Sequence, residues 1–322
     1  MTPARNRMEE TSMSMEETSM SNSDTAPPTM DPTAPPPIVG DHAVEVADGV
    51  FVIPDPRSPV VPNIGIVVGD RAALVVDTGL GPRNGEIAHR VAREIAGDRP
   101  LLVTTTHFHP EHGFGVQAFR DATIAYNRAQ HEEFLRKRDG YLAQFRGFGG
   151  AIAEQLDGVE FVEPHVVYDG GADIDLGGKV AQLRTWGPAH TRGDQTVYLP
   201  AEGILFTGDL VEDRFYPIFP FFPPYDADLD ANNWIVVIEG LQRLGARTIV
   251  PGHGDLGDPG LLAVTHEYLT LLRAETKRLA AEGHDAGEII AILTPRLRDR
   301  YPDWDPSEPW RVATGVQTFL AQ

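Results

Sequence analysis

Three histidines and one glutamate crowd into six consecutive positions, in the motif HFHPEH that follows the apolar stretch LLVTTT. In extended backbone, side chains two residues apart leave the same side of the chain, so His107 and His109 are predicted to point the same way. Pro110 favours an extended residue before it and suits the first position of a helix. Glu111 and His112 then fall in the first helical turn, close to both earlier histidines.

Four nitrogen and oxygen donors are therefore predicted to converge on one strand-to-helix turn. Imidazole and carboxylate together suit a divalent cation of borderline hardness, zinc above all, with iron or manganese as alternatives. The chain has 0 cysteines, which excludes thiolate ligands, disulfides and cysteine nucleophiles. A cluster of surface histidines in a loop is the other interpretation, but this spacing favours a metal site.

Three further donors each follow a predicted strand. His190 lies in WGPAHTRGD, Asp209 in ILFTGDL and His253 in TIVPGHGD. A single histidine in such a place is more often an ordinary polar residue than a ligand. Three donors that repeat the same placement indicate a functional site, because rigid scaffolds present functional groups on the loops where strands end.

Taken in order, these segments resemble those of the metallo-β-lactamase-fold metallohydrolases. The similarity covers about residues 44–255 and rests on VVDTG, HFHPEH, GPAHTRGD, FTGDL and PGHGD. It implies an α+β fold, a four-layer αββα sandwich, with two metals in a cleft at one edge of the sheets. It implies that three histidines hold the first metal: His107, His109 and His190. It assigns to the second metal Glu111, His112 and His253, with Asp209 bridging the pair and Asp77 steadying a histidine ligand.

The chemistry that the resemblance implies follows from the metals, expected to be two zinc ions. Two cations that share a water lower its pKa toward neutrality and yield a hydroxide without a strong protein base. That hydroxide would attack a small ester, thioester, lactone or amide, and less readily a phosphoryl or sulfuryl centre, while the metals stabilise the oxyanion. Glu111 and Asp209 are the carboxylates expected to take part in catalysis. The leading prediction is a zinc-dependent hydrolase of a small molecule.

Position 111 departs from the family, most of which has aspartate there. The extra methylene moves the carboxylate by about a bond length, whereas metal–ligand distances are fixed within ~0.2 Å. Glu111 could bind the second metal, or it could orient the nucleophile and weaken that site. Asp209 and the absence of cysteine place the chain nearer to thioesterase- and lactonase-like members than to lactamases that use a thiolate ligand.

The same residues also allow two other functions. One is a mononuclear iron oxygenase on the same fold, similar to the sulfur dioxygenases, since two histidines and a carboxylate around one iron suffice for that chemistry. The other is a non-catalytic binding protein with a decayed site, which only Glu111 supports.

The elements that must position these donors begin after a tail. Residues 1–40 contain MEETSMS twice and then a stretch rich in Pro, Ser and Thr, a composition that predicts disorder. Residues 41–322 are predicted to form one domain with a C-terminal helical segment. Strand patterns precede an amphipathic helix at 81–97 and a helical region at about 127–157. A second β-rich half is expected from near Phe161, with helices at about 230–243, 258–282 and 285–293. Two sheets packed face to face with helices outside would accommodate this order.

Bulk composition restricts the partners. Of 322 residues, 27 are basic and 47 acidic, and the formal net charge of −20 disfavours nucleic acids and anionic membranes. No stretch approaches the roughly 20 apolar residues of a membrane span, and the N-terminus lacks the apolar region of a secretory signal. A cytoplasmic protein acting on a small-molecule substrate is therefore expected.

Aromatic residues gather in the segment 213–228, directly after Asp209. Five of them alternate with prolines, which exclude a helix or a central strand: Tyr216, Phe219, Phe221, Phe222 and Tyr225. The segment is either a loop packed onto the core or a stiff aromatic wall beside the metals. A wall would favour an apolar or aromatic substrate.

Overall fold

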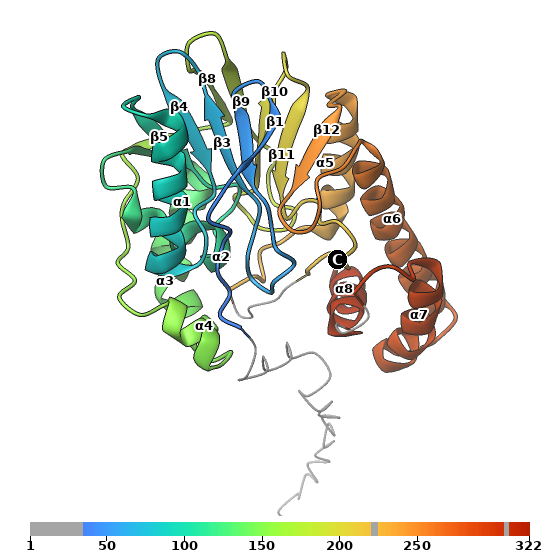
Figure 1. The fold of residues 1–322 in the computed structure, drawn as a ribbon. Helices are drawn as coiled ribbons and strands as arrows, with labels where there is room; N and C mark the ends of the chain where they lie inside the picture. Colours follow the sequence, from blue (N-terminus) through green and yellow to red (C-terminus); the bar gives the residue numbers. More distant parts are fainter. Residues whose placement is uncertain (1–34, 220–224, 306–308) are drawn as a thin grey trace, which may run out of the picture.

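Two β-sheets pack face to face between two layers of helices in this computed structural model, which describes residues 35–219, 225–305 and 309–322 (Figure 1). Helices α1 (Gly81–Ala96) and α3 (Arg128–Arg146) cover the first sheet, and α5 (Ala231–Arg243) and α6 (Gly260–Ala281) cover the second. The predicted four-layer αββα sandwich is confirmed.

The first sheet has seven strands in sequence order, antiparallel from β1 to β4 and parallel from β4 to β7. Its strands are β1 (Val44–Ala47), β2 (Val50–Ile53), β3 (Ile64–Val68), β4 (Ala73–Val76), β5 (Leu101–Thr104), β6 (Thr123–Asn127) and β7 (Val166–Tyr168). The helices that connect the parallel strands are α1 (Gly81–Ala96), α2 (Pro110–Gly113), the 3₁₀ turn η1 (Val116–Ala118), α3 (Arg128–Arg146) and α4 (Gly150–Gln155).

The second sheet has five strands in the order β12-β11-β10-β9-β8. They are β8 (Gly171–Asp175), β9 (Val180–Thr185), β10 (Gln195–Leu199), β11 (Ile204–Gly208) and β12 (Thr248–Pro251). Helix α5 (Ala231–Arg243) connects β11 to β12, which pair in parallel. Three helices complete the chain: α6 (Gly260–Ala281), α7 (Ala286–Arg300) and α8 (Pro309–Ala321).

The sequence-based boundaries need three corrections. The segment around Val166 was expected in the second sheet, but it pairs in parallel with β6 and closes the first sheet. Helix α7 continues past Pro295 to Arg300, beyond the predicted end near residue 293. Packed chain also begins before residue 41, because Val39 is buried and Asn84 of α1 binds its N–H and the carbonyl of Pro37.

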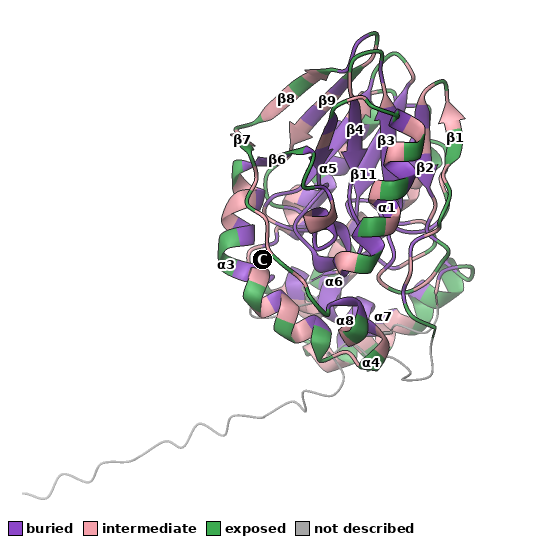
Figure 2. Cartoon of the chain, turned by 60° about the vertical axis from the view of Figure 1, so that its left-hand side comes forward, coloured by how far each residue is buried: buried purple, intermediate pink, exposed green. Residues whose placement is uncertain are grey.

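Apolar side chains on both faces of the central strands explain why the sandwich has three apolar interfaces, one between the two sheets and one between each sheet and its helices. In β4, Ala73 and Val75 face the helices of the first sheet, while Leu74 and Val76 face the second sheet. Successive side chains on a strand point to opposite faces, so a strand that is apolar at every position must be covered on both sides. The central strands are accordingly buried, whereas the helices carry exposed residues on their outer faces (Figure 2).

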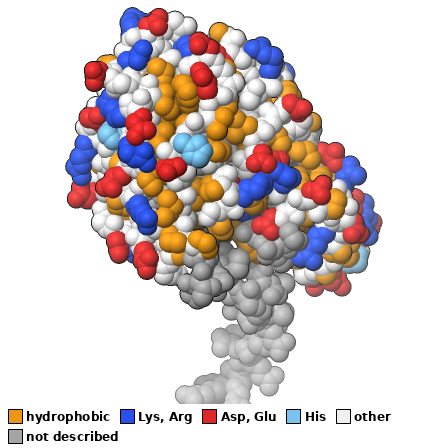
Figure 3. Space-filling view, viewed as in Figure 1, with side chains coloured by type: hydrophobic (Ala, Val, Ile, Leu, Met, Phe, Trp, Pro, Cys, Tyr) orange, Lys and Arg blue, Asp and Glu red, His pale blue; other side chains and the backbone are white. Residues whose placement is uncertain are grey.

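The surface of the molecule mixes both signs of charge. Acidic and basic side chains are interspersed over the face viewed in Figure 3, with apolar side chains between them. Several pairs are close enough to be ion pairs, such as Arg71 with Asp175 at 2.6 Å and Arg128 with Asp169 at 2.6 Å. Among the described residues, no helix combines the length and the apolar character needed to cross a membrane.

Candidate metal centre

The predicted donors come from four strand ends that meet at one edge of the sandwich. His107 and His109 follow β5, and α2 begins at Pro110. His190 lies in the loop between β9 and β10, Asp209 follows β11 directly, and His253 lies just beyond β12. The segments are far apart in sequence, so the sandwich itself brings the side chains together.

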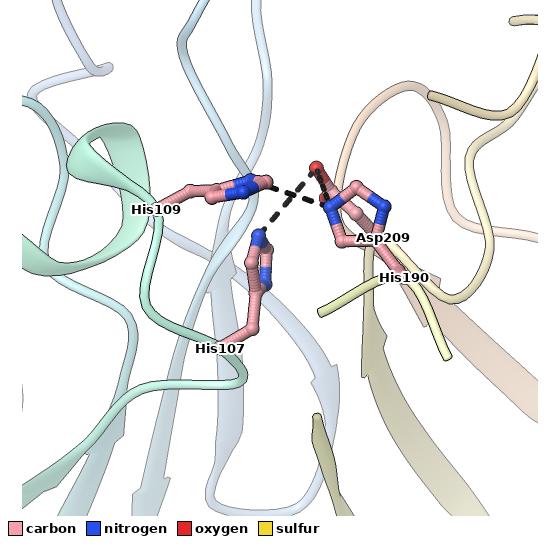
Figure 4. Close-up of side chains that lie close together, drawn as sticks. All are labelled: His107, His109, His190 and Asp209. Atoms are coloured by element: carbon pink, nitrogen blue, oxygen red, sulfur yellow. Dashed lines mark hydrogen bonds and ion pairs between the residues drawn. The ribbon is translucent and has the colours of Figure 1, made fainter. Parts of the chain in front are cut away.

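The first cluster joins three histidines to one carboxylate, with all donor atoms within 4.8 Å of one another: His107, His109, His190 and Asp209. Figure 4 shows these side chains pointing toward a common region. The Nδ1 atom of His109 lies 3.3 Å from Nε2 of His190, and Nε2 of His107 lies 3.8 Å from Oδ2 of Asp209. This is the group that the resemblance assigned to the first metal.

The second cluster shares Asp209 with the first and meets the same 4.8 Å limit: Glu111, His112, Asp209 and His253. Nε2 of His112 lies 3.3 Å from Oδ1 of Asp209, and Nε2 of His253 lies 3.7 Å from Oδ2. The carboxylate of Asp209 therefore lies between the two clusters. All of these residues are buried, His253 being the most exposed at 8%.

Several of these donor atoms have no hydrogen-bond partner in the described part of the chain. They are Nε2 of His107, Nε2 of His112, Oε2 of Glu111 and both carboxylate oxygens of Asp209. Buried polar atoms are nearly always paired, so such a group calls for an explanation. Imidazole nitrogens and carboxylate oxygens gathered in two such groups are the ligand set of divalent metals such as zinc. The residues present thus fit a pair of cations.

Asp77 lies beside the second cluster at the end of β4. Its Oδ2 is 3.0 Å from Nδ1 of His112, and its Oδ1 accepts the N–H of Thr106 at 2.7 Å. The backbone of Asp77 is left-handed, with φ at 69°. Such a conformation is uncommon outside glycine and is found at functional sites where the surroundings hold it in place.

The other imidazoles also have a partner on the nitrogen that faces away from the clusters. Nδ1 of His190 contacts the carbonyl of Ile218 at 3.0 Å, and Nδ1 of His253 contacts that of Val61 at 3.1 Å. For His107 the partner is the hydroxyl of the adjacent Thr106 at 3.2 Å. For His109 it is the carboxylate of Asp226, whose Oδ1 lies 3.6 Å from Nε2. Such partners fix the orientation and tautomer of metal-binding histidines. Sequence reasoning found only Asp77, because a backbone carbonyl leaves no mark on the sequence and because Thr106 and the carboxylate beside His109 belong to no motif that marks them as partners of histidines.

Burial and neighbouring charges set the protonation of the donors. Burial, together with the nearby His109, lowers the pKa of His190 to about 3, so this imidazole is neutral at pH 7. Burial alone would lower the pKa of His112, but Asp209 and Asp77 outweigh it and hold that pKa well above its usual value. Burial would raise the pKa of Asp209, yet His112 and His253 hold it well below its usual range. The centre therefore presents a neutral imidazole at His190 and an ionised carboxylate at Asp209, which the two clusters share.

Two of the five aromatic residues predicted to form a wall after β11 pack into the core. Tyr216 and Phe219 are 3% and 1% exposed and belong to the apolar cluster between the second sheet and the C-terminal helices. These two residues therefore pack onto the core, which is the first of the two alternatives predicted for this segment. Tyr225 is half-buried against Tyr141, with ring centroids 5.8 Å apart. The other two aromatic residues of the predicted wall, Phe221 and Phe222, lie outside the described residues.

Comparison with known proteins agrees with the family resemblance of the sequence motifs. The family model of the metallo-beta-lactamase superfamily matches residues 57–253. An acyl-coenzyme A thioesterase of Bos taurus, MBLAC2, is 30% identical over 243 residues, which cover 70% of this chain and 85% of that protein. A metallo-beta-lactamase type 2 of Bacillus cereus is 27% identical over 65% of this chain and 73% of its own length. The structure of a metallo-beta-lactamase from Pontibacter korlensis matches with a TM-score of 0.54 and 22% identity, over 71% of this chain and 98% of the other.

Proposed function

The chain belongs to the metallo-beta-lactamase superfamily, and on that premise we propose that it is a hydrolase that holds two zinc ions and cleaves an acyl thioester. The two donor clusters that share Asp209 carry the hydrolase part of this proposal. The thioester part is supported by the relative at 30% identity, which is named as an acyl-coenzyme A thioesterase. Acyl-coenzyme A is therefore the first substrate to test.

The ligands of the proposed pair follow from the two clusters. His107, His109 and His190 would hold one ion, Glu111, His112 and His253 the other, and Asp209 both. When bound, such ions supply a water of lowered pKa and a Lewis acid that polarises the thioester carbonyl. Hydrolysis adds water across the carbonyl carbon–sulfur bond and yields a carboxylic acid and a thiol. A thiol has a pKa of about 8.5 and leaves readily as the thiolate, so the reaction needs no strong acid from the protein.

The number of donors favours the hydrolase over the iron oxygenase that the sequence also allowed. A single iron needs two histidines and a carboxylate, and the first cluster alone supplies those. The second cluster would then have no role, although Glu111 and His112 each bring a buried donor atom that lacks a hydrogen-bond partner within the described ranges. A second ion gives both of them a function.

The test combines elemental analysis of the purified full chain with assays of thiol release from acyl-coenzyme A. We expect about two zinc ions per chain and turnover that a chelator abolishes. His107→Ala should lose the first metal and turnover, whereas His42→Ala should lose neither, because His42 is exposed and belongs to neither cluster. Esters, lactones and a cephalosporin serve as competing substrates. About one iron per chain, or full thioesterase turnover in His107→Ala, would refute the proposal.

A further inference from the structure

Helix α3 turns a polar face toward the metal centre. Four polar residues at helical spacing lie on this face, and we call them the α3 stripe: Gln130, Glu133, Lys137 and Tyr141. All four are between 0% and 3% exposed. A glutamate and a lysine four residues apart usually form a solvent-exposed pair, and burying such a pair is costly unless many contacts satisfy it. The contacts of the stripe therefore indicate what it holds.

One end of the α3 stripe holds the loop that carries His190. Oε2 of Glu133 accepts the N–H of Gly193 at 2.9 Å, and Oε1 lies 3.4 Å from the N–H of Arg192. A Cβ at position 193 would lie 2.7 Å from Gln130 and 2.8 Å from Glu133, so only glycine allows this close approach. The peptide that follows His190 is thus fixed against α3.

The stripe also binds the strand end that leads to His107 and His109. Nε2 of Gln130 donates to the carbonyl of Thr105 at 2.7 Å. Both chain segments that supply histidines to the first cluster therefore dock on the same helix.

The other end of the stripe holds a carboxylate against His109. Oδ1 of Asp226 lies 3.6 Å from Nε2 of His109, and it accepts the hydroxyl proton of Tyr141. Nζ of Lys137 lies 3.9 Å from Asp226, 2.6 Å from Glu133 and 2.9 Å from Asp228. Lys137 therefore balances the negative charge of two carboxylates: Asp226, which lies beside His109, and Glu133, which holds the loop of His190.

We infer that the α3 stripe is a positioning element for the first metal site, acting on His109 through Asp226 and on the His190 loop through Glu133. A carboxylate beside Nε2 of His109 favours the proton on that nitrogen, which leaves the Nδ1 lone pair for a metal. That Nδ1 faces Nε2 of His190 at 3.3 Å, where one ion could accept both lone pairs (Figure 4). The inference rests on the proposed metal centre and adds residues that do not themselves bind metal.

Asp226→Asn is the main test, because it keeps the shape of the side chain and removes its charge. Asp228→Asn is the matched control, since Asp228 lies in the same segment and pairs with the same lysine. Each protein is titrated with zinc against a chromogenic chelator, and the visible spectrum of its cobalt form is recorded. Asp226→Asn should weaken one of the two sites about ten- to hundredfold, the usual effect of losing a partner behind a metal ligand, and should alter the cobalt spectrum. Asp228→Asn should behave as the wild type in both measurements.

Wild-type affinity and spectrum in Asp226→Asn would overturn the inference, and so would an equal loss in Asp228→Asn. If Asp226→Asn does not fold, Tyr141→Phe replaces it, since this variant keeps the carboxylate and removes only the hydroxyl that orients it. A smaller loss at the same site is then expected, and no loss would overturn the inference. A wild-type chain that binds no metal would refute the proposed function instead.

Discussion

Replacing Asp77 with asparagine should weaken the second metal site more than the first. Asparagine tolerates the left-handed backbone at this position, where φ is 69°, so the fold is not strained by the change. Its side-chain oxygen can still accept the N–H of Thr106, which Asp77 binds at 2.7 Å. The altered contacts are those of Oδ2, which lies 3.0 Å from Nδ1 of His112 and 3.0 Å from the hydroxyl of Thr106. At His112 an amide N–H now meets the imidazole N–H.

The size of the effect follows from the nature of that contact. Hydrogen bonds to charged groups contribute about 1.5–3 kcal/mol, and both partners are buried here, so solvent does not screen the interaction. Since 1.36 kcal/mol corresponds to a factor of ten, the affinity of the second site should fall about ten- to hundredfold. The first site should lose less affinity, because Asp77 contacts none of its histidines directly and is linked to it through the Thr106 hydroxyl, which lies 3.2 Å from Nδ1 of His107.

The assay is a zinc titration that resolves two sites, carried out by competition with a chelator. Asp285→Asn is the control, because Asp285 caps α7 at an exposed position and asparagine caps helices equally well. If Asp77→Asn bound both metals with wild-type affinity, the carboxylate would not support His112. If it lost both sites equally, Asp77 would act on the whole loop rather than on one ligand.

Three further predictions test other parts of the site and fold. Glu111→Asp should reduce bound zinc from about two ions per chain to one, because its carboxylate withdraws by about 1.5 Å where the tolerance is ~0.2 Å; two ions by elemental analysis would contradict this. Although burial lowers the pKa of His112, Asp209 and Asp77 raise it well above its usual value, so the second metal must displace a proton. Affinity for that metal should then rise about tenfold per pH unit until the pH passes that pKa. Chelator competition at several pH values measures this dependence, and an affinity that does not change with pH would contradict the prediction. Phe319→Ala in α8 should lower the free energy of unfolding by about 3–5 kcal/mol, since this ring is 0% exposed; a denaturation curve showing less than about 1 kcal/mol would mean that α8 is not part of the domain core.

The sequence alone was sufficient for the donor types and for the layered fold. In HFHPEH the local backbone geometry alone brings four donors together. The extended residues place His107 and His109 on one side, and the helix that begins at Pro110 places Glu111 and His112 in its first turn. His190, Asp209 and His253 could be recognised because each follows a strand, and strand ends are readable from apolar patterns. The same patterns supported two sheets with helices outside, although the short strand at Val166 was placed in the wrong sheet.

Tertiary packing decided which face of each element meets water. Periodicity shows that Glu133 and Lys137 share a helix face, but the same pair would suit solvent, and only the packing of α3 against the metal loops buries it. Tyr216 and Phe219 could line a cleft or fill a core, and the C-terminal helices determined the outcome by covering them. The backbone carbonyls of Ile218 and Val61 contact His190 and His253. Every residue has such a carbonyl, so the residue types at 218 and 61 do not predict these contacts. Burial depends on which distant segment arrives to exclude solvent, and that information is distributed over the whole chain.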